Sequence, residues 1–232
     1  VAVESGATLH GETPVTGFER VSDGYVIHTT RGKTVARDLI FAANGYIDGA
    51  NKWLRRRIVP IPSCMIATEP LSPNLMKTLM PAGRGMGETR KLYRYFRPSP
   101  DGRRILLGGR SSMFGRSEAE SGAHLLKGLI EMYPELSDTK ISHSCNGLVD
   151  FSRSDIPLLF QRDGAHYTGG YCGSGVVWAR WIGQKAALKI LGSPEGASAF
   201  DCDPPPAVPF FNGRTWFLPA VLGWHGLLDK LG

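Results

Sequence analysis

The stretch HYTGGYCGSGVVWARWIGQKAALKIL, residues 166–191, contains the strongest local pattern in this sequence. Residues 166–168 predict a short strand, and the apolar face that begins at residue 175 predicts a helix. Between them, glycine occupies four of the seven positions 169–175, and glycine lets a backbone turn sharply and approach a ligand closely. A helix start offers unpaired N–H groups and the positive end of the helix dipole. The stretch therefore predicts a strand–turn–helix unit that binds an anion or an electron-rich oxygen; a tight turn without a ligand is the alternative.

An apolar run further upstream indicates the kind of sheet on which this helix packs. Leu39-Ile40-Phe41-Ala42-Ala43 follows Asp38 and is ended by Asn44-Gly45. So short a run predicts a strand buried on both faces, as in a parallel sheet, with a core strand of a β-sandwich as the alternative. The helix is expected to pack on the sheet through a face of mostly small residues: Val176, Ala179, Gly183, Ala186 and Ile190.

Turn residues, alternation and capping residues predict the other elements. An antiparallel hairpin is expected from residues 93–97 and 104–109, which are separated by a turn-forming segment. Ser117 and Glu120 have the spacing of a capping box, which predicts a helix that ends before Pro134. Further predictions are a hairpin at 25–36, an extended strand at 58–71, an irregular segment at 73–90 and a proline-rich surface segment at 203–219.

The composition is that of an ordinary globular protein. With 232 residues, of which 42% are hydrophobic and 21% charged, the chain can bury a core without disulfides or a metal ion. No apolar run approaches the roughly 20 residues that span a bilayer, and the start resembles no signal peptide. We therefore expect a cytoplasmic protein with no membrane partner. Because the sequence opens on Val1 and in what looks like the middle of a domain, we also expect a fragment.

The spacing of cysteine and histidine gives no support to metal or hydrolytic chemistry. The four cysteines, Cys64, Cys145, Cys172 and Cys202, lie far apart and form no CxxC pair, and the six histidines form no HExxH motif. No GxSxG sequence is present. We expect reduced thiols, no bound metal and no Ser–His–Asp triad.

Positive charge is concentrated in one segment. Residues 84–116 hold nine Lys or Arg and two acidic residues, a net charge of +7, whereas the whole chain carries +6. A solvated strand face explains most of these residues, and no nucleic-acid motif accompanies them, so we expect no nucleic-acid partner. The segment Gly83-Arg84-Gly85-Met86-Gly87 is not a dinucleotide-binding loop, because no apolar strand precedes it and no helix follows it.

Several stretches, in this order, resemble the C-terminal portion of the D-amino-acid-oxidase superfamily of FAD-dependent oxidoreductases, and in particular its gamma-glutamylputrescine oxidase-like group. The resemblance covers nearly the whole chain. It rests on SGATLHGETPVTGFE (5–19), ARDLIFAANGY (36–46), VPIPSCMIATEPL (59–71), YRYFRPSPDGRRILLGGR (93–110), GGYCGSGVVWARWIGQKAA (169–187) and RTWFLPAV (214–221).

The resemblance implies an α/β (α+β) fold with two parts. Residues 1–57 and 152–202 would be the remainder of a FAD-binding domain with a parallel sheet. Residues 58–151 would form an antiparallel-sheet substrate domain, and residues 203–232 a C-terminal tail that packs on the surface. We therefore expect this chain to lack the N-terminal βαβ unit of the family, with its GxGxxG loop and the acidic residue that binds ribose. FAD affinity should therefore fall, and we expect the fragment alone to be inactive.

The resemblance also implies which residues contact FAD. Val15 would offer backbone hydrogen bonds near the adenine, and the strand end at Ala42, Ala43, Asn44 and Gly45 would lie beside the dinucleotide. The glycine-rich turn would place the helix start against the pyrimidine end of the flavin, where negative charge gathers on reduction. Its residues are Gly170, Tyr171, Cys172, Gly173, Ser174, Gly175 and Val176.

Two departures from the family pattern concern cysteines. Cys172 and Ser174 stand where the family often has Ser and His, so the flavin contact is expected to differ in detail. Cys145 stands where many relatives have an aromatic residue. Some relatives attach flavin through a cysteine, but Cys145 does not match that position, and we expect FAD to bind without a covalent bond.

The implied reaction is oxidation of an amine or amino acid to an imine, by hydride transfer to flavin and reoxidation by oxygen. Tyr46, Tyr95, Arg97 and Arg110 are the candidate pocket residues, with Arg97 or Arg110 pairing a substrate carboxylate. For either arginine, a surface salt bridge is the alternative. For the chain as a whole, the alternative is a non-catalytic module that binds an anion or a nucleotide through the glycine-rich turn and the basic segment.

Overall fold

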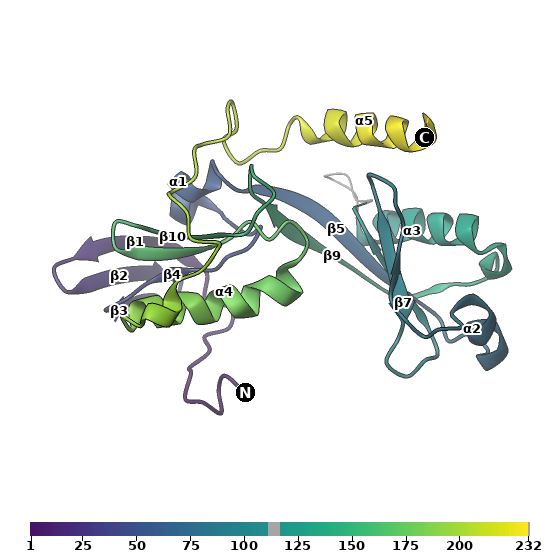
Figure 1. Ribbon diagram of the computed structural model, residues 1–232, viewed down its shortest axis with the longest axis horizontal. Helices are drawn as coiled ribbons and strands as arrows, with labels where there is room; N and C mark the ends of the chain where they lie inside the picture. Colours follow the sequence, from purple (N-terminus) through teal and green to yellow (C-terminus); the bar gives the residue numbers. More distant parts are fainter. Residues whose placement is uncertain (111–116, 232) are drawn as a thin grey trace. The chain divides into compact units, whose positions relative to one another are not determined.

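The computed structural model describes residues 1–110 and 117–231, and these form two compact units. The first unit comprises Val1–Val59 and Asp150–Arg214, and the second comprises Pro60–Val149 and Thr215–Gly232 (Figure 1). Arg116, the last residue of the basic segment, lies outside the described residues.

The first unit contains an antiparallel sheet of three strands, β1 (Val15–Val21), β2 (Gly24–Thr29) and β3 (Gly32–Ala36). The β2–β3 pair is the hairpin predicted at residues 25–36, with Thr29 opposite Gly32 at the turn. Tyr25 and Ile27 alternate with partly exposed residues and enter the core of this unit.

A second sheet of the first unit has the order β10 (Leu158–Arg162), β11 (Ala165–Gly169), β4 (Ile40–Phe41). β11 is antiparallel to β10 and parallel to β4, with His166 opposite Ile40 and Tyr167 opposite Phe41. The parallel strand predicted from the apolar run at residues 39–43 is therefore present, although only two of its residues pair. Its predicted burial on both faces is wrong, because β4 lies at the edge of this sheet and none of residues 39–43 is buried. Residues 158–160 and 165–169 are buried, as expected for strands covered on both faces, whereas the residues 161–164 around the turn are exposed or partly exposed.

Helix α4 (Gly175–Ile190) is separated from the end of β11 by five residues and packs against that strand. Its buried face differs from the predicted one. Ile182 and Ala186 are fully buried together with Leu159 and Tyr171, whereas Val176 and Gly183 are exposed. The predicted stripe of small residues missed Ile182. Apolar residues of both small and large size occur on all sides of this helix, so its sequence alone does not single out one buried face.

The second unit is built on a five-stranded sheet in the order β6-β7-β8-β5-β9. β7 is antiparallel to β6 and β8, and β5 is antiparallel to β8. The predicted hairpin of residues 93–97 and 104–109 is thus β7–β8. The strands are β5 (Val59–Thr68), β6 (Met86–Gly87), β7 (Arg94–Pro98), β8 (Ile105–Gly109) and β9 (Ile141–Phe151).

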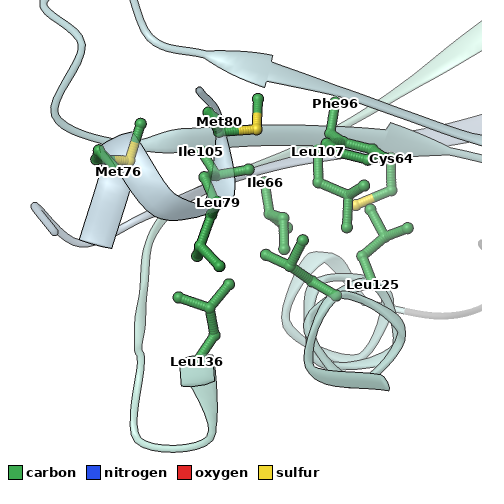
Figure 2. Close-up of a cluster of buried hydrophobic side chains, with 11 residues drawn as sticks. Cys64, Ile66, Met76, Leu79, Met80, Phe96, Ile105, Leu107, Leu125 and Leu136 are labelled. Carbon is green, nitrogen blue, oxygen red and sulfur yellow. The ribbon is translucent and has the colours of Figure 1, made fainter. Parts of the chain in front are cut away.

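Helix α3 (Glu118–Met132) covers one face of this sheet and forms the core with it. Figure 2 shows Leu125 of α3 and Leu136 pointing toward side chains that descend from the strands, among them Ile66 and Leu107. All four of these side chains are at most 1% exposed. Burial of such aliphatic side chains contributes about 1.5–3 kcal/mol each, which makes this cluster the main source of stability in the second unit.

Two helices of the second unit were not predicted. α2 (Pro73–Leu79) lies in the segment expected to be irregular. Ser72 caps it by accepting the N–H of Leu75, and Pro73 stands in the first turn, where its missing N–H costs nothing. α5 (Leu218–Leu231) follows the proline-rich segment, and Asp229 accepts the N–H groups of Lys91 and Leu92.

Several short helical turns complete the structure. None of the described helices is long and apolar enough to cross a bilayer. All four cysteines are free, and only Cys64 is fully buried. The short elements are η1 (Gly49–Asn51), α1 (Lys52–Arg55), η2 (Pro134–Leu136) and η3 (Pro194–Gly196).

The capping box predicted for α3 is present in the structure. Ser117 Oγ accepts the N–H of Glu120 at 3.2 Å, and Glu120 Oε2 accepts the N–H of Ser117 at 2.8 Å. Two of the unpaired N–H groups at the helix start are thereby satisfied. Tyr133 and Pro134 end the helix, as the sequence predicted.

Replacement of the cap should destabilise the second unit measurably. Ser117→Ala leaves the N–H of Glu120 without its acceptor, and we expect the free energy of unfolding in urea to fall by about 1 kcal/mol. Ser137→Ala is the control, because Ser137 is also exposed and its side chain caps no helix. Equal unfolding curves for the two variants would contradict a stabilising role for the capping box.

Candidate functional site

The glycine-rich turn between β11 and α4 has an unusual backbone. Gly170, Cys172 and Gly173 all have positive φ, at 69°, 52° and 99°, a region that glycine enters freely and other residues seldom. At Gly170 space also requires glycine, because an added Cβ would lie 2.8 Å from Cβ of Ser152. The turn is therefore specified by its glycines, and Cys172 is held in a conformation that cysteine rarely adopts.

The second part of this turn, from Gly173 to Val176, contains backbone N–H donors that no described residue accepts. Ser174 N–H donates to Tyr171 O at 2.9 Å, and the N–H groups of Val177 and Trp178 both donate to Ser174 O at 3.1 Å. Within the described residues, no acceptor is found for the N–H groups of Gly173, Gly175 and Val176. Val176 is 98% exposed. This end of α4 can therefore receive an anion or an electron-rich oxygen.

The first part of the turn, from Gly170 to Cys172, is held by one fully buried residue, Asp150. Its Oδ2 accepts the N–H of Gly170 at 2.5 Å, and its Oδ1 accepts the N–H of Tyr171 at 3.0 Å. Its backbone carbonyl accepts the N–H of Cys172 at 2.9 Å. Asp150 thus accepts hydrogen bonds from three successive N–H groups of the turn, although it lies twenty positions before Gly170.

Asp150 also connects the turn to the end of strand β4. Its own N–H donates to Oδ1 of Asn44 at 3.1 Å, and Asn44 has a positive φ of 51°. Two of the predicted site segments, the strand end at 42–45 and the turn at 170–176, are thereby brought together in the first unit. Asp150 was missed by sequence reasoning, because an isolated aspartate in the run Leu148-Val149-Asp150-Phe151 carries no local sign of its distant partners.

Burial sets the electrostatics of this carboxyl group. Removal from water raises the pKa of Asp150 above its ordinary value, and the N–H groups of Gly170 and Tyr171 oppose that rise by stabilising the charged form. Burial also raises the pKa of the Cys172 thiol, which donates to Gly170 O at 3.2 Å. Cys172 is consequently a protonated, hydrogen-bonded group of the turn rather than a reactive thiolate.

A cavity of about 510 Å³ lies in the first unit beside the end of β4. Four predicted site residues line it: Val15, Ala42, Ala43 and Tyr46. Its walls are mainly apolar, with Phe41 and Leu54 among them. Asn44 and Gly45 do not line this cavity. Tyr46 is 59% exposed and lies at its border with solvent.

The other three predicted pocket residues lie in the second unit, on the sheet face opposite α3. Tyr95 and Arg97 of β7 are exposed, whereas Phe96 between them is buried toward α3. Tyr95 stands opposite Gly108 of β8, and its ring occupies the place that a side chain at Gly108 would need. Arg110 lies over the ring of Tyr93, 5.3 Å from its centroid. Tyr93, Tyr95, Arg97 and Arg110 therefore share one aromatic and basic surface.

Part of the basic segment has structural roles. Arg94 is held by Glu88 at 2.7 Å and is only 11% exposed. Arg104 donates to Thr68 O at 2.9 Å and to Ser142 Oγ at 2.8 Å. These two residues are exceptions to the solvated strand face predicted for most of the segment. In the described part of the chain, no cluster of His, Cys, Asp or Glu has the arrangement of a metal site.

Two curated relatives cover nearly all of this chain. It is 31% identical over 234 residues to the probable oxidoreductase OrdL of Rhizobium meliloti, an alignment that covers 99% of this chain and 53% of the relative. It is 28% identical to gamma-glutamylputrescine oxidoreductase of Escherichia coli, over 98% of this chain and 54% of the relative. The chain therefore spans about half the length of the curated relatives it matches.

The fold is also similar to that of a solved oxidase. Glycine oxidase from Geobacillus kaustophilus superposes with a TM-score of 0.71 at 20% identity, over 90% of this chain and 55% of that one. The family model of FAD dependent oxidoreductases, abbreviated DAO, matches residues 1–188. On this match, which extends through the glycine-rich turn and most of α4, the chain belongs to the DAO family of FAD-dependent oxidoreductases.

Proposed function

We propose that this chain is the part of a flavoenzyme that oxidises an amine or an amino acid to an imine, with molecular oxygen as the final electron acceptor. The observation that carries the proposal is the exposed start of α4, where the N–H groups of Gly173, Gly175 and Val176 have no acceptor among the described residues. Membership in a FAD-dependent family supplies the cofactor, and the printed names of glycine oxidase and gamma-glutamylputrescine oxidoreductase suggest the substrate class.

The residues of the first unit fit a flavin nucleotide. The unused N–H groups can meet an electron-rich ring edge, and the apolar cavity beside β4 can take a planar aromatic group. We assign Val15 and Ala42 as contacts of the part of the cofactor that enters this cavity. Asn44 and Gly45, at the end of β4, are assigned as neighbouring contacts. We assign the flavin end to the turn residues Gly170, Tyr171, Cys172, Gly173, Ser174, Gly175 and Val176, with no covalent bond.

The protein contributes orientation and electrostatics to this reaction. When bound, FAD supplies the oxidant that accepts a hydride from the carbon next to the substrate nitrogen. The start of α4 presents partial positive charge where negative charge develops on the ring, so it stabilises the charged product of transfer more than the reactants. The substrate amine must be held with that carbon close to the ring, which is a task of positioning rather than of acid–base chemistry.

Substrate contacts are proposed for Tyr46, Tyr95, Arg97 and Arg110. An arginine fork matches a carboxylate with two parallel hydrogen bonds, and the rings of Tyr93 and Tyr95 offer flat surfaces to an alkyl chain or an ammonium group. The sheet surface of the second unit is therefore suited to an amine that also carries a carboxylate.

The 232-residue chain by itself is expected to bind FAD weakly and to oxidise no amine. Its sequence carries no GxGxxG motif, and that motif holds the pyrophosphate in dinucleotide-binding folds. The proposed activity is accordingly assigned to the product of the complete reading frame that encodes this chain. We propose the cytoplasm as the location of that product.

Anaerobic reduction tests the proposed function directly. The product of the complete reading frame is loaded with FAD and mixed, without oxygen, with a panel of amines and amino acids. We expect at least one of them to bleach the flavin absorbance near 450 nm, and admission of air to restore it with release of peroxide. A bound flavin whose spectrum no amine changes would favour a non-catalytic nucleotide-binding module. Bleaching that air does not reverse would contradict oxygen as the acceptor.

A pair of arginine variants tests the carboxylate assignment. If Arg97 or Arg110 pairs a substrate carboxylate, replacement by glutamine should raise KM for a carboxylate-bearing amine by about tenfold or more, because a charge-assisted hydrogen bond is lost. KM for the same amine without the carboxylate should hardly change. Arg103→Gln, an exposed arginine of the β7–β8 turn, is the control. An equal effect on both substrates would assign these arginines to the fold instead.

A further inference from the structure

We infer that Asp150 is a positioning residue of the flavin site, which holds the turn Gly170–Cys172 from behind so that the N–H groups of Gly173, Gly175 and Val176 stay free at the start of α4. The inference rests on the proposed function, since it takes those free N–H groups to be the contact with flavin. Asp150 itself is fully buried and is not placed in contact with cofactor or substrate.

The hydrogen bonds divide the turn into two sets of donors. The N–H groups of Gly170 and Tyr171 end on the Asp150 carboxylate, and that of Cys172 ends on the Asp150 carbonyl. The next donors along the chain, at Gly173, Gly175 and Val176, end on no described residue. A turn with this backbone presents its second set outward only while the first set is held inward.

Water cannot easily take over this role. The carboxylate has no exposed surface, so water cannot replace it without a rearrangement. Cys172 and Asn44 both occupy left-handed backbone conformations, which cost about 1 kcal/mol or more for residues with a side chain. The hydrogen bonds of Asp150 reach both of them, so one residue stabilises both strained positions.

This arrangement links two parts of the proposed cofactor site. Asn44 belongs to the strand end assigned to the dinucleotide, and the turn is assigned to the flavin ring. Because the N–H of Asp150 is bound to Asn44 Oδ1 and its carboxylate to the turn, a change at Asp150 should disturb both ends. A residue that merely filled space would not affect the turn and the strand end together.

Asp150→Asn is the informative variant, because the amide keeps the size of the carboxylate but turns one acceptor into a donor. That donor would face the N–H of Gly170 or Tyr171, and one of the two hydrogen bonds must break. In hydrogen–deuterium exchange of the 232-residue chain, we expect the amides of Gly170 and Tyr171 to exchange at least tenfold faster. Asp155→Asn is the matched control, an exposed aspartate whose positive φ asparagine tolerates, and it should change neither rate more than twofold.

The second readout is specific to a positioning role. In the FAD-loaded product of the complete reading frame, Asp150→Asn should weaken FAD binding at least tenfold and shift the midpoint potential of the bound flavin, while Asp155→Asn should match the wild type. Faster exchange at Gly170 and Tyr171 with unchanged FAD affinity and potential would overturn the inference and leave Asp150 a structural residue. A wild-type protein that binds no FAD would instead overturn the proposed function.

A second variant serves if Asp150→Asn does not fold. Asn44→Gly allows the left-handed backbone and removes the acceptor of the Asp150 N–H, while Asp150 and the two N–H partners of its carboxylate are not substituted. We expect faster exchange of the Asp150 amide and FAD binding weakened about threefold. Unchanged FAD binding, together with a faster Asp150 amide, would again overturn the inference.

The pH dependence of stability gives an independent check on the burial of this carboxyl group. Because burial raises its folded pKa, the folded chain holds the proton to higher pH than the unfolded chain. The contribution of Asp150 to stability is then complete below its ordinary pKa and is lost as pH rises through the folded pKa. The nearby titratable groups, Tyr171 and Cys172, are both neutral in that range because burial raises their pKa values. We expect the stability advantage of the wild type over Asp150→Asn to shrink as pH rises from about 3.8. An advantage that grows with pH would contradict the raised pKa of this buried carboxyl group.

Discussion

The hydrogen bonds that converge on the buried carboxyl group of Asp150 are the constraint on which the candidate site depends. They hold the first residues of the glycine-rich turn inward and leave the donors at the start of α4 for a ligand. A buried acceptor is effective here because water does not compete for the same N–H groups, and the same burial makes the group costly to replace. Glycine at position 170 and a left-handed backbone at Cys172 and Asn44 are consequences of this geometry.

Features with local causes were predictable from the sequence. The glycines at 169–175 predicted the turn and the start of α4, Ser117 and Glu120 predicted the start of α3, and the alternation at 93–97 predicted β7. Each of these depends on residues a few positions apart. α2 and α5 were missed, because Pro73 and the proline-rich run before α5 were interpreted as signs of irregular structure. The buried face of α4 was missed because it is decided by contacts with β10 and β11 that periodicity does not contain.

The candidate site, like the fold, was predictable from the sequence only in part. The resemblance to a flavoenzyme family singled out several stretches, and the structure joins two of them, 42–45 and 170–176, through Asp150. Asp150 itself could not be predicted, since its partners lie twenty and one hundred and six positions away. The roles of Tyr46, Tyr95, Arg97 and Arg110 stay predictions: one lines a cavity of the first unit, and the other three share a sheet face of the second.

The central claim is that the free N–H groups at the start of α4 meet the flavin ring. Titration of the ¹⁵N-labelled product of the complete reading frame with FAD, followed by amide chemical shifts, measures this contact directly. The account predicts that the amides of Gly173, Gly175 and Val176 shift most within the turn, with those of Gly170 and Tyr171 shifting less because their N–H groups stay on Asp150. FAD that binds without moving the three exposed amides would contradict it.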